Sequence, residues 1–260
     1  MITTWSRGCP DSSMAEGLLV ETWRKVRAHP WWAARAKLVV ALLREHGIQA
    51  PASVLEAGCG WGVNLDALEE AGYRVTGLDV SRRILELIDR PERHLAEADL
   101  MQDLPSDAGL SDAVLALDVI EHLDDDRAAL SRLEKLVRPG GLMIVSVPAL
   151  PELWSAFDEV QGHRRRYLPT TLRQAFGGTN LELTKVLWWG AWMVRLLRAM
   201  RSNPRRPLAQ DPAETYAQFL RLPPWPGPWL MQLAFSWEQR RALAGKLRIG
   251  TSLIAISTRR

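Results

Sequence analysis

The sequence predicts an α/β fold built on a doubly wound sheet, and three observations lead to this class. From about residue 53, apolar runs alternate with amphipathic stretches, which is the order of strands and helices in a parallel sheet. The glycine-rich segment "VLEAGCGWG" (54–62) joins the first apolar run to the first helical stretch. The segment "DAVLALDVI" (112–120) contains a continuous apolar run, 113–117, which is typical of a strand buried on both faces.

Local signals bound the elements in chain order. The first helix, 63–72, ends at Gly72, and Ser81 is placed to cap the second, which stops before Pro91. Pro-Gly-Gly closes the helical segment 125–141. Right-handed crossovers then define a seven-stranded Rossmann-like sheet, with strands expected at 52–58, 73–80, 93–100, 112–120, 142–149, 181–189 and 251–258.

The two ends of the chain add material to this sheet. We divide the sequence into an N-terminal helical lid segment, 1–50, and a main domain, 51–260. Between the last two strands the main domain carries a helical cap insertion, 189–248, which is rich in tryptophan. A helix at 170–178 precedes the sixth strand.

Composition places the chain among ordinary globular proteins. Hydrophobic residues make up 47% and charged residues 24% of the 260 positions, and the net charge is only +3. The two cysteines, Cys9 and Cys59, predict neither a disulfide framework nor a metal cluster. The N-terminal stretch lacks the pattern of a signal peptide, and no run of 18 apolar residues occurs. We therefore expect a cytoplasmic protein without a metal site.

The glycine turn decides between ligands. Gly58, Gly60 and Gly62 allow a ligand to approach the backbone closely. A dinucleotide fingerprint needs G-x-G-x-x-G, but Val63 stands at the place of its last glycine. A Walker loop needs Gly-Lys-Ser/Thr, and neither Lys nor Ser/Thr follows. Both phosphate-binding interpretations are therefore weakened.

"VLEAGCGWG" resembles the first motif of class I S-adenosylmethionine-dependent methyltransferases. Further motifs follow in the order of that family over residues 53–148: "VTGLDVS", "AEADL", "LALDVIEHL" and "LVRPGGLMIVSVP". The resemblance implies S-adenosyl-L-methionine as cofactor. It also implies a methyltransferase domain over 51–260.

The resemblance assigns roles to the residues of these motifs. Glu56 either bonds the glycine loop or holds the ammonium group of the cofactor. Asp79 can accept both ribose hydroxyls, although a NAD-binding fold would place an acid there too. Asp99 is expected at the adenine amine with Leu100 on the ring, and Asp118 at the methionine end or the acceptor. The predicted cofactor residues are Glu56, Gly58, Cys59, Gly60, Gly62, Asp79, Val80, Asp99, Leu100 and Asp118.

Two flanking segments resemble a bacterial, type 11-like subgroup that methylates small molecules. They are "HPWWAARAKLVVALL" (29–43) and "WSAFDEVQGHRRRYLPTTLRQAF" (154–176). Trp31 and Trp32 in the first segment either form a lid that keeps water from the sulfonium or anchor a helix to the core. At 33–34 the sequence departs from the subgroup, because two alanines replace a bulkier pair.

Candidate catalytic residues follow the fourth and fifth strands. His163 is the first candidate for a base that takes a proton from the acceptor, and His122 is the second. Either histidine could instead serve a structural role. Asp158 would orient His163 or pair with an arginine of 164–166, and Tyr167 would bond the acceptor or close the pocket. Those arginines would bind an acceptor anion or pair with surface acids.

The acceptor is expected to be a small, hydrophobic molecule methylated at O, N or C. Nucleic acid is not expected, because no base-methylation motif follows the fourth strand. The tryptophans of the insertion would roof such an acceptor or pack a helical cap. A lipid-linked or membrane-adjacent acceptor ranks second, and a non-catalytic cofactor-binding module is a further alternative. The sequence leaves the oligomeric state and the role of Trp61 open.

Overall fold

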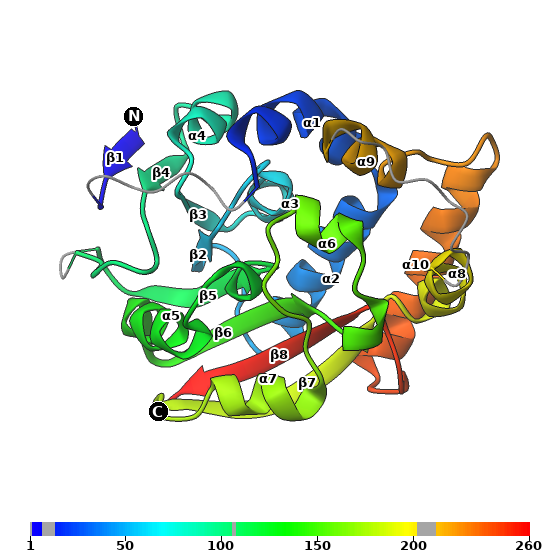
Figure 1. Ribbon diagram of the computed structural model, residues 1–260. Coiled ribbons are helices and arrows are strands. Elements are labelled where there is room, and N and C mark those ends of the chain that lie inside the picture. The colour runs from blue at the N-terminus through cyan, green and yellow to red at the C-terminus, as the bar shows by residue number, and fades with distance from the viewer. Residues whose placement is uncertain (1, 7–13, 106–107, 202–211) are drawn as a thin grey trace.

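The protein is seen in a computed structural model that describes residues 2–6, 14–105, 108–201 and 212–260. Cys9 and residues 202–211 of the cap insertion lie outside the described residues. A mixed eight-stranded sheet runs through the molecule in the order β1-β4-β3-β2-β5-β6-β8-β7 (Figure 1). The strands are β1 Ile2–Thr4, β2 Ser53–Ala57, β3 Arg74–Asp79, β4 His94–Glu97, β5 Ser111–Leu117, β6 Val137–Pro148, β7 Leu181–Trp189 and β8 Ser252–Arg259.

The predicted fold class is confirmed, and all seven predicted strands are present. Among the described strands, β8 alone runs opposite to the others, and it pairs antiparallel with β6 and β7. The structure adds an eighth strand, β1, which pairs in parallel with β4 at the sheet edge. This three-residue strand depends on a partner more than ninety positions away, as in the pairing of Ile2 with Leu95, so no local pattern marks it.

Helices cover both faces of the sheet. Apolar residues of α2, α3 and α10 form one core, and those of α5 and α7 contribute to another. The segment 125–141, expected as a helix, splits, because α5 passes into a 3₁₀ turn and β6 follows at once. The helices are α1 Glu16–Ala28, α2 Pro30–Glu45, α3 Val63–Glu70, α4 Arg82–Ile88, α5 Asp126–Leu133, α6 Ala156–Val160, α7 Pro169–Ala175, α8 Ala191–Arg201, α9 Pro212–Phe219 and α10 Gly227–Leu243, with 3₁₀ turns η1 Ile120–His122, η2 Glu134–Leu136 and η3 Pro151–Leu153.

The strand order reverses between β2 and β5. The chain passes outward from β2 through β3 to β4 and then returns to the other side of β2 as β5. In doubly wound sheets the ligand site lies beyond the carboxyl ends of the strands at such a switch point. Helices α1 and α2 precede the sheet, and α8, α9 and α10 stand between β7 and β8. Among the described residues, no helix has the length and apolar character needed to cross a membrane.

Candidate active site

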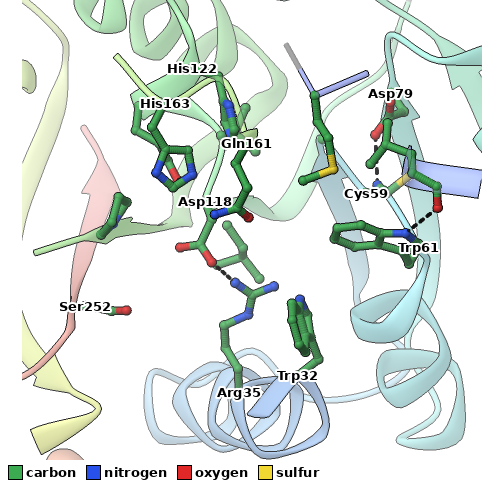
Figure 2. Close-up of a pocket in the computed structure, with 18 of the residues that line it drawn as sticks. Trp32, Arg35, Cys59, Trp61, Asp79, Asp118, His122, Gln161, His163 and Ser252 are labelled. Atoms are coloured by element: carbon green, nitrogen blue, oxygen red, sulfur yellow. Dashed lines mark hydrogen bonds and ion pairs between the residues drawn. The ribbon is translucent and has the colours of Figure 1, made fainter. Parts of the chain in front are cut away.

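A cavity of about 750 Å³ opens at this switch point. Its volume lies within the range of roughly 300–1,000 Å³ that is usual for ligand pockets. The lining comes from the N-terminal helices, the carboxyl ends of the strands and the cap helices. Figure 2 shows His122 and His163 on one side of the pocket, and Cys59, Trp61 and Asp79 on the other. Nine of the ten predicted cofactor residues line it, and Gly62 does not.

The glycine turn follows β2 and is shaped for close approach. Gly58 has a φ of +68°, and a Cβ atom added there would overlap the side chain of Val119. Gly62, also at positive φ, precedes the first residue of α3, where an added Cβ would lie 3.2 Å from Arg93 Nη1. The turn therefore excludes side chains at these positions. Cys59 between them is 5% exposed and lines the cavity.

Glu56, at the end of β2, is a buried acid at the cavity wall. Its side chain accepts a hydrogen bond of 2.5 Å from Asn64 Nδ2 through Oε1. Its other oxygen, Oε2, receives no hydrogen bond within the described part of the chain. Burial raises the pKa of Glu56 to about 8. An orphan oxygen on a buried carboxylate is suited to an ammonium group that arrives with a ligand.

Asp79 ends β3 and Asp99 lies two residues beyond β4, and backbone amides help to position both. Asp79 accepts hydrogen bonds from the amides of Gly60, at 2.8 Å, and Ser81, at 3.0 Å. Asp99 accepts from the amide of Met101 at 2.8 Å. A carboxylate has about four acceptor positions, so each keeps acceptor capacity for a ligand. Val80 and Leu100, beside them, line the cavity as predicted.

Asp118 follows β5 in the left-handed region, with a φ of 57°. This conformation is uncommon for residues other than glycine and is tolerated by aspartate. The carboxylate accepts a hydrogen bond of 2.8 Å from Ser146 Oγ and forms an ion pair with Arg35 of α2. Figure 2 shows Arg35 reaching from its helix toward Asp118 across the pocket. The N-terminal helix and the sheet thus meet through a charge pair at the centre of the site.

Trp61 fastens the glycine turn to the first helix. Its indole Nε1 donates a hydrogen bond of 2.8 Å to the carbonyl of Leu19 in α1. In return, Arg27 of α1 donates at 3.0 Å to the carbonyl of Trp61. The Trp32 ring stands edge-on to Trp61, with ring centroids 6.1 Å apart. This residue, left without a role by the sequence, therefore joins the N-terminal helices to the cofactor side of the pocket.

Trp31, the neighbour of Trp32, turns toward the cap. Its ring centroid lies 5.8 Å from that of Trp189 and 5.6 Å from that of Phe235 in α10. Trp31 and Trp32 both contribute to the cavity wall. The two adjacent tryptophans therefore make different contacts: Trp32 packs on the glycine turn, and Trp31 packs on the cap.

His163 is held by a buried aspartate. Its Nδ1 lies 3.0 Å from Asp158 Oδ1, and Asp158 also accepts a hydrogen bond of 2.7 Å from Arg166 Nε. Burial alone would raise the pKa of Asp158, but the bonds from His163 and Arg166 outweigh it, and the pKa lies below its usual value. Asp158 is fully buried behind the cavity wall, whereas His163 lines it. The pair has the form of a base and its orienting carboxylate.

Glu121 completes this side of the pocket and was not singled out from the sequence. It is fully buried, and neither carboxylate oxygen accepts a hydrogen bond from another described residue. Its Oε1 lies 3.9 Å from His163 Nε2. Burial, with the nearby charge of Asp118, raises the pKa of Glu121 well above the ordinary value. Glu121 belongs to the 3₁₀ turn η1, which places its carboxylate next to the His163 ring. In the sequence, the only signal for Glu121 is its position shortly after a buried strand.

His122 stands against His163, with ring centroids 4.7 Å apart. Burial and the neighbouring His163 lower the pKa of His122 to about 4, so it is uncharged and weakly basic near pH 7. The ligand atoms of Glu121, His122 and His163 lie within 4.8 Å of one another, so the cluster also has the composition of a divalent metal site.

Tyr167, Arg164 and Arg165 all bond other groups of the protein, and of these three only Arg164 lines the cavity. Tyr167 donates a hydrogen bond of 2.7 Å to Asp126 and is not among the residues that line the cavity. Arg164 and Arg165 donate to main-chain carbonyls of the loop after β5, at 2.8 Å and 2.9 Å. Arg164 also pairs with Asp124. These contacts favour the structural interpretation of Tyr167 and Arg165, whereas for Arg164 and Arg166, which line the cavity, both interpretations stand.

Comparison with known proteins assigns the family. Residues 31–186 match the family described as a methyltransferase domain. The chain belongs to this family. It is 31% identical to a malonyl-[acyl-carrier protein] O-methyltransferase of Pseudescherichia vulneris, over 62% of this chain and 66% of the relative. It is 27% identical to a ubiquinone biosynthesis O-methyltransferase of Chromobacterium violaceum, over 46% and 58%. Among the first curated relatives, the matches span between 49% and 66% of their length.

Solved structures share the fold. A SAM-dependent methyltransferase from Archaeoglobus fulgidus aligns with a TM-score of 0.53 at 15% identity, over 86% of this chain and 94% of that one. A TehB-like SAM-dependent methyltransferase from Corynebacterium glutamicum aligns with a TM-score of 0.51 at 16% identity, over 87% and 88%. At such identities the likeness concerns the fold alone.

Members of the methyltransferase family bind S-adenosylmethionine, and the pocket of this chain fits that cofactor. The orphan oxygen of Glu56 suits an ammonium group, and the turn at Gly58 packs closely on Val119, which also lines the cavity. Asp79 and Asp99 offer acceptors at the ends of adjacent strands. Such a donor and acceptor set suits a ligand with an amino acid, a ribose and a base.

Proposed function

We propose that the chain is an S-adenosylmethionine-dependent methyltransferase that methylates a hydroxyl or carboxyl oxygen of a small, hydrophobic acceptor. The observation that carries the proposal is the His163–Asp158 pair, which faces the cofactor residues across one cavity. The named relatives, both O-methyltransferases, support oxygen as the methylated atom. Nitrogen and carbon acceptors, also open from the sequence, rank below it.

The cofactor would lie along the ends of β2, β3 and β4. In this proposal Glu56 binds the ammonium group, the loop with Gly58, Cys59 and Gly60 lies against the amino acid arm, and Asp79 accepts from the ribose. Asp99, Leu100 and Val80 enclose the adenine, while Asp118 and Arg35 border the methyl end. When bound, S-adenosylmethionine supplies a methyl group that an oxygen nucleophile can attack in line.

The chain's own groups then act on the acceptor. Asp158 accepts the Nδ1–H of His163, which leaves Nε2 free to take a proton from a hydroxyl. The negative charge of Asp158 stabilises the imidazolium that results. Burial raises the pKa of Glu121 well above its ordinary value, and in its protonated form Glu121 can donate a hydrogen bond to the acceptor. His122, with a pKa of about 4, is the weaker candidate for the base.

The chemical character of the cap supports an apolar acceptor. Met193 and Leu197 of α8, with Phe219 and Leu220 near the end of α9, border the cavity. These side chains exclude water from the reacting atoms and offer no charge to a polar substrate. A lipid-linked acceptor is the alternative that the tryptophan-rich cap favours. The non-catalytic module is the second alternative.

Turnover of the purified chain tests the proposal. S-adenosylmethionine is supplied with a panel of phenols and carboxylic acids that carry apolar tails, and formation of the demethylated cofactor is measured. His163→Asn should lower kcat by about 10²–10⁴-fold while cofactor affinity is unchanged. His94→Asn, at an exposed position of β4, is the matched control and should keep full activity.

Three outcomes would overturn parts of the proposal. Cofactor binding without turnover on any acceptor would favour the non-catalytic module. Stabilisation by NAD but not by S-adenosylmethionine would reassign the pocket to a dinucleotide. Activity that a chelator removes and Zn²⁺ or Mn²⁺ restores would reassign Glu121, His122 and His163 from proton transfer to metal binding.

A further inference from the structure

The outer face of the cap exposes a continuous apolar stripe. On α10, Trp229, Leu233 and Trp237 follow one another at intervals of four residues, and Leu230 lies beside Trp229. Their exposed fractions lie between 49% and 54%. Trp225, in the loop before the helix, is 86% exposed. We call Trp225, Trp229, Leu230, Leu233 and Trp237 the cap patch.

The same helix is firmly packed on its other side. Phe235, Glu238 and Ala242 are buried against the body of the protein. Phe235 packs on Trp31 and Trp189, and Glu238 receives the amide of Ala191. The exposure of the cap patch is therefore not that of a loosely held helix. Large apolar side chains on a fixed helix mark a surface for a partner.

The chain segment that carries the cap patch exposes charges of one sign. Between positions 221 and 250 the chain carries Arg221, Arg240, Arg241, Lys246 and Arg248. The only carboxylate in that span, Glu238, is fully buried. The Arg241 guanidinium lies over the Trp237 ring, 4.9 Å from its centroid. Beyond the span, Glu45 accepts from Lys185, which also donates to the Leu243 carbonyl near the end of α10.

We propose that the cap patch docks the protein on the surface of an anionic lipid bilayer. Tryptophan favours the interface between headgroups and acyl chains, and arginine and lysine bind anionic headgroups there. A second copy of the chain fits this surface poorly, because a twofold contact would bring the same cations together. The charge complementarity thus selects a lipid surface over self-association.

Docking through this face would place the cavity close to the bilayer. Helices α8 and α9 line the cavity with Met193, Leu197, Phe219 and Leu220, and α10 is joined to α8 through Glu238 and Ala191. Figure 1 shows α8 and α10 together on the side of the molecule opposite β1. This inference concerns the location of the protein and does not depend on the identity of the acceptor.

Vesicle co-sedimentation of the full chain tests the docking. Vesicles of phosphatidylcholine alone are compared with vesicles of phosphatidylcholine and phosphatidylglycerol in equal parts. We expect binding to the anionic vesicles that weakens with salt. Trp229→Ser with Trp237→Ser should lower the partition coefficient by roughly tenfold or more. Arg240→Gln with Lys246→Gln should lower the partition coefficient by about 25-fold, because each cation near an anionic surface contributes about fivefold to binding.

Matched controls separate docking from damage to the fold. Trp154→Ser removes a tryptophan that is 38% exposed outside the cap, and Arg173→Gln with Lys135→Gln removes two exposed cations. Both should bind vesicles like the wild type. Cofactor binding by every variant confirms that the pocket is folded.

Equal binding by the cap-patch variants and the wild type, or no binding to anionic vesicles, would refute the proposal. So would a dimer in sedimentation equilibrium that the Trp229 and Trp237 substitutions dissolve, because the patch would then be an interface between copies.

Discussion

Replacing Glu56 with glutamine distinguishes two effects of this buried acid: its destabilisation of the folded protein and its contribution to cofactor binding. Burial raises the pKa of Glu56 from 4.5 to about 8 in the folded chain. In the unfolded chain the carboxyl is ionised above about pH 4.5, so at neutral pH unfolding releases its proton and is favoured. At pH 7 the solution is about 2.5 pH units above the unfolded-state pKa of Glu56. At about 1.4 kcal/mol per unit, the buried acid lowers the free energy of unfolding by roughly 3 kcal/mol.

Glutamine removes this penalty because it does not ionise and still offers an acceptor to Asn64. Without ligand, Glu56→Gln should therefore unfold with a free energy up to about 3 kcal/mol higher than the wild type at pH 7, and less than about 1 kcal/mol higher at pH 5. The difference should grow from pH 4.5 to about 8 and then level off. Denaturant unfolding at several pH values measures it, with Glu70→Gln on the exposed end of α3 as control.

Ligand binding should show the opposite preference. An ammonium group at Glu56 requires the ionised carboxylate, so cofactor binding near pH 7 should release about one proton. Glu56→Gln should bind the cofactor about 10- to 100-fold more weakly, from roughly 1.5–3 kcal/mol for a charged hydrogen bond, and should release no proton. Titration calorimetry in two buffers of different ionisation enthalpy counts the proton. A stability difference independent of pH, or equal proton release by both proteins, would refute the reasoning.

Three further substitutions test the geometry of the site. Gly58→Ala should destabilise the protein by about 1–3 kcal/mol, because the new methyl overlaps Val119 at a positive φ; unchanged denaturant unfolding would contradict the shape of the turn. Trp61→Phe should remove one hydrogen bond to α1, about 1 kcal/mol, and speed amide hydrogen exchange there, and unaltered exchange in α1 would show that the bond is dispensable. Arg35→Met should cost about 1–3 kcal/mol because Asp118, partly exposed, loses its cation; a stability within 0.5 kcal/mol of the wild type would show that solvent screens the pair.

Much of the sheet could be predicted because local sequence patterns mark its strands and turns. Parallel strands buried on both faces leave continuous apolar runs, and the glycines and prolines between them mark the turns. Strand β1 was not predicted from the sequence, because its three residues form a strand only through their pairing with β4. The 3₁₀ turn η2 escaped because a helical pattern continues through the point where the chain must join β6.

The cofactor side of the pocket followed from motifs, whereas its other side depends on contacts far apart in sequence. Trp61 binds Leu19, 42 positions earlier, and no pattern in the turn indicates that partner. Glu121 lies in a stretch of mixed polarity that gives no sign of burial. Its raised pKa comes from burial and from the nearby charge of Asp118, so composition alone could not separate it from a surface acid.

The hydrogen bond between Glu238 and Ala191 links the two cap helices α10 and α8. The buried carboxylate on α10 accepts the amides of Gly190 and Ala191 at the start of α8. A shift of α10 must carry α8 with it or leave a buried acid without its donors, which costs more than a local adjustment. The cap patch on α10 and the cavity wall at Met193 and Leu197 of α8 therefore belong to one connected pair of helices.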